Sequence, residues 1–202
     1  MKLLKLTKTA AVAAVVGLAA FSPALADSIK IGEINHYKRM AAFAEPYKNG
    51  IILALEEVNG AGGVLGKDLE FIFRDDQGDP GEAVKIAEEL MTRDGAAMLT
   101  GTILSHVGLA ISSYAAEKKY VYLAAEPLAD ALVWEKGNDY TFRLRASTYM
   151  QAAMLAEAAA KTGAKKWATI APNYAYGKDA VAAFKKALTA IALVFSIFQL
   201  NP

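Results

Sequence analysis

The feature that most constrains the fold of this chain is a repeated switch in the spacing of its apolar residues. Residues 29–34 and 69–73 carry apolar side chains with the period of a β-strand, whereas residues 47–58 place theirs on one face of a helix. This alternation continues along the chain. It predicts further strands at 97–100, 120–124, 140–145 and 167–171, and further helices at 80–91, 105–118, 148–161 and 178–188.

Strands that alternate with helices of this length form βαβ units, so the predicted class is α/β, a mostly parallel sheet flanked by helices. The start of the helix at 80 is indicated by three residues. Asp79 suits the capping position, Pro80 suits the first helical position, and Glu82 suits the third helical position. Ligands of such sheets bind outside the carboxyl ends of the strands. Candidate site residues therefore lie in the loops that lead from strand to helix.

The first 26 residues have the layout of a secretory signal peptide. Three lysines precede an apolar run at 10–21, and Ala24 and Ala26 form an A-x-A cleavage site. The apolar run is shorter than the roughly 20 residues that a membrane-spanning helix needs. We therefore expect export and a mature chain that begins at Asp27.

Charge and cysteine content exclude several functions. The chain has 22 basic and 21 acidic residues, and three of the basic ones but no acidic one lie in the predicted signal peptide, which leaves a net charge of −2. A chain with this charge balance has no broad positive potential to attract phosphate backbones or anionic lipid, so no nucleic acid partner is expected. The absence of cysteine excludes a disulfide framework, a thiolate metal site and a cysteine nucleophile.

Three patterns that could carry chemistry have simpler interpretations. The glycine-rich run 60–66 follows a helix and precedes a strand, which is the reverse of a dinucleotide-binding loop, so we interpret it as a helix end and turn. The acidic run 75–79 lacks the closing glutamate of an EF-hand and is assigned to turns and helix capping. His36 and His106 have no local ligand spacing, so neither a metal site nor a cofactor is predicted.

Two loops carry side chains suited to a small ligand. Tyr174 and Tyr176 lie between a predicted strand and the next helix, and a tyrosine combines an apolar face with a hydroxyl at low entropic cost. Ser105, at a predicted helix start, is interpreted as a cap or a ligand donor. A serine nucleophile would need a base and an orienting group, and the neighbouring His106 does not identify them.

Three motifs follow one another along the chain: N-G-A-G-G-V-L-G-K at 59–67, D-D-Q-G-D-P-G-E-A at 75–83, and Tyr176-Gly177. In this order they resemble the N-x-x-G-G-v-x-G-k, D-D-x-x-D-P-x-x-A and Y-G motifs of the periplasmic binding proteins of the leucine/isoleucine/valine type. These proteins are the solute receptors of branched-chain amino acid ABC transporters. The resemblance extends from the signal peptide to about Lys186.

The resemblance implies a type I periplasmic binding fold, in which two α/β lobes close on a small solute and deliver it unchanged to a permease in the inner membrane. It also implies ligand contacts from an aromatic residue of the first loop, a serine after the third strand, main-chain groups after the fourth strand and the tyrosine of the Y-G pair. Together with the second tyrosine of that loop, the predicted ligand-binding residues are Phe43, Ser105, Ala125, Glu126, Tyr174 and Tyr176.

Glu126 departs from the family pattern, which usually has small residues and a threonine at this point. A glutamate beside a ligand carboxylate would repel it. Either Glu126 points away from the ligand, or it meets an amine or a hydroxyl. Amides, aromatic acids and other small solutes are therefore candidates beside the branched-chain amino acids.

The end of the chain departs from the family as well. Residues 27–145 correspond to a nearly complete first lobe, and residues 146–188 to the start of a second, partial lobe. Residues 189–202 form an uncharged apolar tail without the expected polar alternation. We expect this tail to be foreign to the family, from a truncated or frameshifted gene.

These observations predict a non-enzymatic, periplasmic, solute-binding component of an ABC transporter. Two alternatives remain open from the sequence. The first is a secreted α/β hydrolase that uses Ser105 with His106 or His36. The second is a sensory ligand-binding lobe, which would need a signalling partner or a transmembrane anchor.

Overall fold

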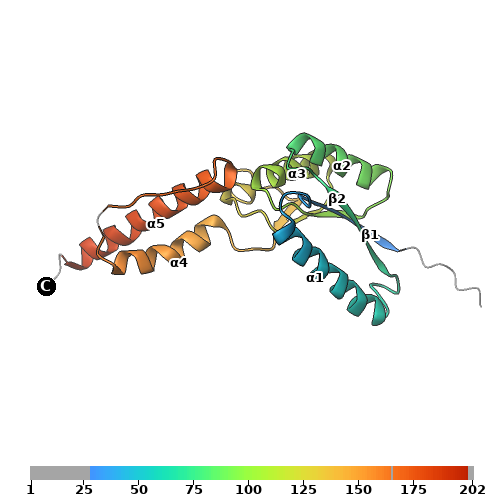
Figure 1. Ribbon diagram of the computed structural model, residues 1–202, viewed down its shortest axis with the longest axis horizontal. Coiled ribbons are helices and arrows are strands. Elements are labelled where there is room, and N and C mark those ends of the chain that lie inside the picture. Colours follow the sequence, from blue (N-terminus) through green and yellow to red (C-terminus); the bar gives the residue numbers. More distant parts are fainter. Residues whose placement is uncertain (1–27, 165, 200–202) are drawn as a thin grey trace, which may run out of the picture.

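The computed structural model describes residues 28–164 and 166–199, with side chains as far as Ile191. Its elements are arranged as a sheet covered by three helices, from which a pair of further helices extends (Figure 1). The predicted signal peptide at 1–26 and the last three residues of the predicted tail lie outside the described residues.

Five parallel strands form one sheet in the order β2-β1-β3-β4-β5. The strands are β1 Ile29–Asn35, β2 Leu69–Asp75, β3 Met98–Gly101, β4 Tyr122–Ala124 and β5 Thr141–Arg143. The α/β class and all five of these strand predictions are confirmed.

The register aligns the carboxyl ends of the strands. Asn35 pairs with Asp75, and Gly101 pairs with both Ile34 and Ala124. We call this side, formed by the last residues of the strands and the loops that follow them, the carboxyl edge. In a parallel sheet this is the edge where ligands bind.

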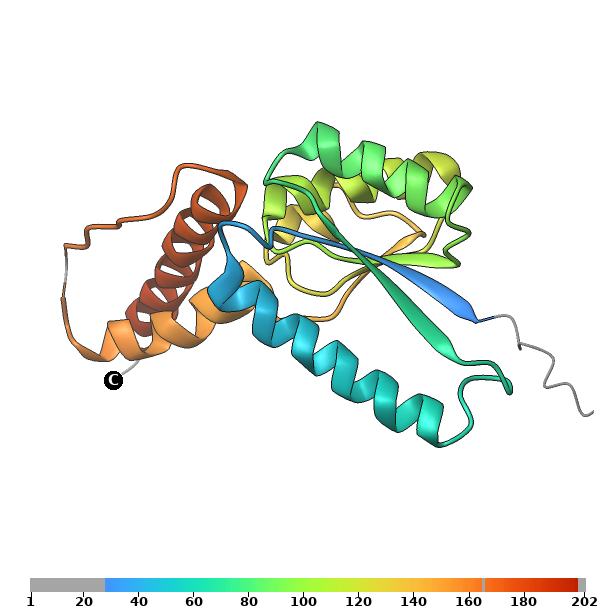
Figure 2. The same ribbon diagram turned by 45° about the vertical axis from the view of Figure 1, so that its right-hand side comes forward.

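Three helices cover the two faces of the sheet. Helix α1 Ala41–Gly60 lies on one face, and α2 Pro80–Thr92 and α3 Ser105–Lys118 lie on the other (Figure 2). A short 3-10 helix, η1 Asp130–Leu132, follows β4. The predicted cap of α2 is confirmed, because the Asp79 side chain accepts a hydrogen bond from the Glu82 backbone N–H at 2.8 Å.

The apolar core lies between the sheet and the α2–α3 face. Ile34, Leu90, Leu99, Ile111 and Tyr122 are among its fully buried residues. Successive residues of a strand point to opposite faces, so Ile34 enters this core while Glu33 and Asn35 face the other way. Strand β1 therefore contributes polar side chains to the α1 side.

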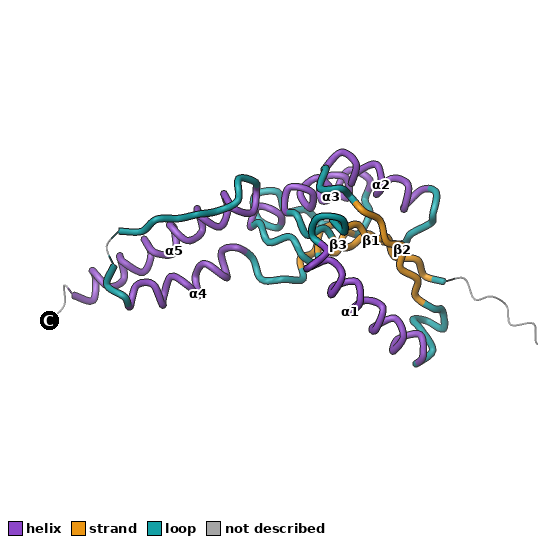
Figure 3. The backbone as a smooth tube through the Cα atoms, in the orientation of Figure 1, coloured by secondary structure: helices purple, strands orange, loops and turns teal. Residues whose placement is uncertain are grey.

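Helices α4 Thr148–Lys161 and α5 Ala175–Gln199 lie side by side and extend away from the sheet (Figure 3). Helix α4 has the predicted bounds, whereas α5 is longer at both ends than the predicted helix at 178–188. The helix includes much of the predicted tail at 189–202. Trp167, before α5, packs edge-to-face against Phe184, with ring centroids 5.9 Å apart.

The predicted strand at 167–171 is wrong. In the described part of this segment no ladder partner lies beside it, and Ile170 is fully exposed. A strand forms only when a neighbouring strand satisfies its backbone groups. The segment has the residue types of a strand but no neighbour to complete one.

No helix in the described part of the chain is long and apolar enough to cross a membrane.

We expect Gly32→Ala to lower the free energy of unfolding by about 1–3 kcal/mol, because an added Cβ would overpack the core. It would lie 3.0 Å from Leu90 Cδ1 and 3.1 Å from Leu99 Cδ2. Gly50→Ala in α1 is the matched control, because nothing lies within 4 Å of its added Cβ, and it should stabilise by about 0.5–1 kcal/mol. Urea denaturation measures both, and equal effects of the two exchanges would contradict this packing.

Candidate functional site

Asn35, the last residue of β1, connects three loops of the carboxyl edge. Its buried side chain accepts hydrogen bonds through Oδ1 from the backbone N–H groups of His36 (2.9 Å) and Ile103 (3.1 Å). Its Nδ2 donates to Oε2 of Glu126 at 2.5 Å. One amide thus joins the chain segments that follow β1, β3 and β4.

Glu126 lies in the loop after β4 and is buried, as is the neighbouring Ala125. Burial raises the pKa of the Glu126 carboxyl, while the hydrogen bond from Asn35 and the charge of Arg145 act in the opposite direction. Both predicted residues therefore belong to the carboxyl edge. Glu126 is turned toward the end of β1, where it meets an amide N–H.

Glu33 is a second buried carboxyl group at this place, and sequence reasoning missed it. Tyr37 donates a hydrogen bond to its Oε2 at 2.5 Å, and its Oε1 has no hydrogen-bond partner among the described residues. Burial, the largest influence, raises the pKa of Glu33 to about 8. The available signal was an acidic residue between Gly32 and Ile34 in a predicted strand.

Gly101 makes room for the Glu33 side chain at the end of β3. A Cβ at this glycine would lie only 2.7 Å from Oε1 of Glu33, and the backbone φ of +101° also favours glycine. Glu33 Oε1 therefore reaches the carboxyl edge although its backbone lies two residues before the end of β1.

Ser105 is the first residue of α3, and its side chain is buried. Its Oγ accepts hydrogen bonds from the backbone N–H groups of Leu128 and Ala129, both at 3.3 Å. The hydroxyl thereby holds the loop after β4 against the start of α3. The sequence prediction placed Ser105 and this loop at one site, and the structure brings them into contact.

The two predicted tyrosines approach the carboxyl edge from the other part of the chain. Tyr174 packs edge-to-face against His106, with ring centroids 5.4 Å apart. The ring centroids of Tyr174 and Tyr176 are 6.0 Å apart. Burial raises the pKa of Tyr174. Phe43 lies in the first turn of α1 and is 61% exposed.

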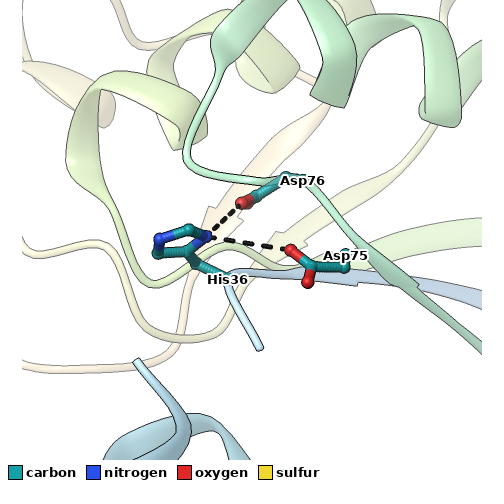
Figure 4. Close-up of side chains that lie close together, drawn as sticks. All are labelled: His36, Asp75 and Asp76. Carbon is teal, nitrogen blue, oxygen red and sulfur yellow. Dashed lines mark ion pairs between the residues drawn. The ribbon is translucent and has the colours of Figure 1, made fainter. Parts of the chain in front are cut away.

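His36, Asp75 and Asp76 form a further cluster at the ends of β1 and β2 (Figure 4). His36 Nδ1 lies 3.4 Å from Asp76 Oδ1 and 3.8 Å from Asp75 Oδ1. These three side chains are close enough to share a metal ion. The prediction that no metal binds here stays a prediction.

The turn roles predicted for the acidic run 75–79 are confirmed. Asp75 Oδ1 accepts from the Gln77 N–H at 2.8 Å, and Asp76 Oδ1 accepts from the Gly78 N–H at 2.7 Å. Short aspartate side chains stabilise turns in this way. The glycine-rich run 60–66 likewise forms a helix end and turn, closed by the pairing of Val64 with Lys67.

A hydrolytic triad is not assembled in the described residues. The His106 Nε2 faces the Gly78 carbonyl oxygen at 3.3 Å, and His36 Nδ1 faces the two aspartates. Ser105 contacts two backbone N–H groups and neither imidazole. The arrangement provides hydrogen-bonding and aromatic groups rather than an activated nucleophile.

Comparison with known proteins places the chain in one family. Residues 29–194 match the family model described as periplasmic binding protein. A Leu/Ile/Val-binding protein homolog of Brucella melitensis biotype 1 is 33% identical over 187 residues, which are 92% of this chain and 50% of that protein. The chain thus spans about half the length of this relative.

Two solved structures are similar in fold. A periplasmic binding protein from Burkholderia mallei is 31% identical with a TM-score of 0.73, covering 81% of this chain and 44% of that one. A solute-binding protein of an ABC transporter from Rhodopseudomonas palustris BisB5, in complex with 3,4-dihydroxybenzoic acid, is 27% identical with a TM-score of 0.73 over the same shares. The parallel sheet and its flanking helices are those of a type I periplasmic binding protein.

We expect the stability of the protein to fall between about pH 5 and about pH 8 because of Glu33. Its pKa is about 8 when folded and 4.5 ordinarily, so within this range the folded state retains a proton that the unfolded state has released. The largest slope is about 1.4 kcal/mol per pH unit. Glu33→Gln should remove this contribution, whereas the exposed control Glu135→Gln should keep it. Urea denaturation at several pH values between about 5 and about 8 measures how stability depends on pH. Identical slopes of stability against pH for the wild type and Glu33→Gln would contradict the raised pKa.

We expect Ser105→Ala to cost about 1–3 kcal/mol of stability, because two N–H groups lose their acceptor. Ser113→Ala is the control, since that hydroxyl is exposed and bonds only within its own helix, to the Leu109 carbonyl. It should change stability by less than about 0.5 kcal/mol. Thermal unfolding compares the two variants, and a neutral Ser105→Ala would show that the hydroxyl does not hold the loop.

Proposed function

Because the chain belongs to the periplasmic binding protein family, we propose that it binds a small solute at the carboxyl edge, as the substrate-binding component of an ABC transporter. The observation that carries this proposal is the convergence of Ser105, Glu126 and the tyrosine loop on that edge. These groups follow different elements of the chain, and ligands of parallel sheets bind where such loops meet.

The proposed solute is an amino acid of the branched-chain type or a related small polar or aromatic compound. Relatives named above are a Leu/Ile/Val-binding protein homolog and a protein in complex with 3,4-dihydroxybenzoic acid. Phe43, Tyr174 and Tyr176 supply aromatic surface, and Ser105 and Glu126 supply polar contacts. The proposed contact of Ala125 is through its main-chain groups.

The proposed partner is a permease in the inner membrane, and the proposed location is the periplasm after removal of residues 1–26. The solute is released unchanged, so the protein is not an enzyme. A secreted hydrolase is less well supported, because the Ser105 hydroxyl accepts two backbone hydrogen bonds and no imidazole is positioned to deprotonate it.

We expect one member of a panel of small amino acids, amides, amines and aromatic acids to raise the unfolding temperature of the purified chain. A ligand that binds only the native state stabilises it by about 2.7 kcal/mol at a hundredfold excess over Kd. Phe43→Ala and Tyr176→Ala should reduce this shift. Leu65→Ala, an exposed apolar residue in the turn before the amino end of β2, is the control and should leave it unchanged.

Mass spectrometry of the recovered solute completes the experiment. An unaltered solute supports binding without chemistry, whereas product formation that requires Ser105 would replace the proposal by the hydrolase. A panel in which no compound changes the unfolding temperature would contradict solute binding by this chain.

A further inference from the structure

Four hydrogen-bond donors of the carboxyl edge are already occupied. The backbone N–H groups of Leu128 and Ala129 donate to Ser105, and that of Ile103 donates to Asn35. The Asn35 Nδ2 donates to Glu126. A solute carboxylate that met these four groups would have to displace one of their bonds.

The acceptors of the same edge are in excess. Glu33 is fully buried, and its Oε1 has no partner among the described residues. Glu126 is buried with an amide as its only hydrogen-bond partner there. A buried polar atom without a partner is destabilising, so a ligand that supplies donors is favoured at this point.

The two buried glutamates of the edge have no paired cation among the described residues. In the described residues neither Glu33 nor Glu126 forms an ion pair with a lysine, arginine or histidine. Every ion pair found there involves other carboxylates. Arg145, which influences Glu126 through its charge, is itself exposed. A buried carboxylate without a cation favours a positively charged ligand over an anion.

We propose that the solute bound at the carboxyl edge presents a cationic N–H group, an ammonium or an amidinium, to Glu126, with Glu33 as the second acceptor behind it. This inference rests on the proposed function and names the chemical class of its solute. It separates the chain from the relative that holds 3,4-dihydroxybenzoic acid, because that ligand is an acid, whereas a cation is expected here.

Proton release from Glu33 is a second measurable consequence of this binding. Its raised pKa means that Glu33 is neutral in most of the protein near pH 7. A cation beside the carboxyl group favours its ionised form, so binding releases protons. Calorimetry in two buffers of different ionisation enthalpy measures that release.

The test compares cationic ligands with carboxylates that have a similar apolar part. Benzylamine is matched with benzoate, and leucinamide with 4-methylpentanoate. Each is added to the purified chain during thermal unfolding and calorimetry. The two cations should stabilise the protein and release protons, and the two acids should do neither.

Glu126→Gln keeps the acceptor for Asn35 but removes the charge. It should weaken the binding of both cations at least tenfold, because a hydrogen bond to a charged group is stronger than one between neutral groups. Glu135→Gln, an exposed carboxylate, is the control and should bind like the wild type. Glu33→Gln should bind cations without releasing protons. If Glu126→Gln does not unfold cooperatively, the comparison of amines with acids on the wild type decides alone.

Two outcomes would overturn the inference in distinguishable ways. Stabilisation by benzoate or 4-methylpentanoate but by neither cation would leave solute binding intact and refute the cationic class. Failure of all four probes, together with the whole panel of the preceding experiment, would refute solute binding itself and the inference with it.

Discussion

The buried amide of Asn35 is the interaction on which the carboxyl edge depends. Asn35 ends β1, and its side chain uses both of its polar atoms, accepting from His36 and Ile103 and donating to Glu126. Losing one such bond leaves a buried group unsatisfied, at a cost of about 1–3 kcal/mol. The positions of three loops are therefore coupled, and Glu126 is fixed at the edge before any ligand arrives.

The same strand contains a feature that lowers stability. Glu33 occupies a position that an apolar side chain would fill at less cost, because burying a carboxyl group removes its hydration. The protein reduces the cost in two ways: Tyr37 donates to one carboxyl oxygen, and Gly101 lacks the Cβ that would collide with the other. A costly group that the surrounding residues accommodate so closely is more consistent with a binding role than with packing.

Local patterns in the sequence predicted most of the fold and only part of the site. The cap at Asp79 and the helices at 105–118 and 148–161 follow from residues that lie close together in the chain. The contact between Asn35 and Glu126 joins positions 91 residues apart, and no local spacing indicates it. The error at 167–171 has the opposite cause, because the local pattern of a strand is present but the neighbour that would complete it is not.

The sheet part of the chain and the α4–α5 helix pair differ in how much apolar surface they bury. In the described residues the sheet part buries leucine, isoleucine and tyrosine, whereas the only apolar residues that α4 and α5 bury are Ala152, Ala156, Ala183 and Ala187. Burial stabilises in proportion to apolar area, so the described side chains of the helix pair contribute far less per residue. The polar half of the site thus lies on a stable sheet. The tyrosine half is held to it by the contact of Tyr174 with His106 and by the hydrogen bond that the Asp130 N–H donates to Asp179 Oδ2 at 2.7 Å. A solute that touches both halves would add further contacts across this junction.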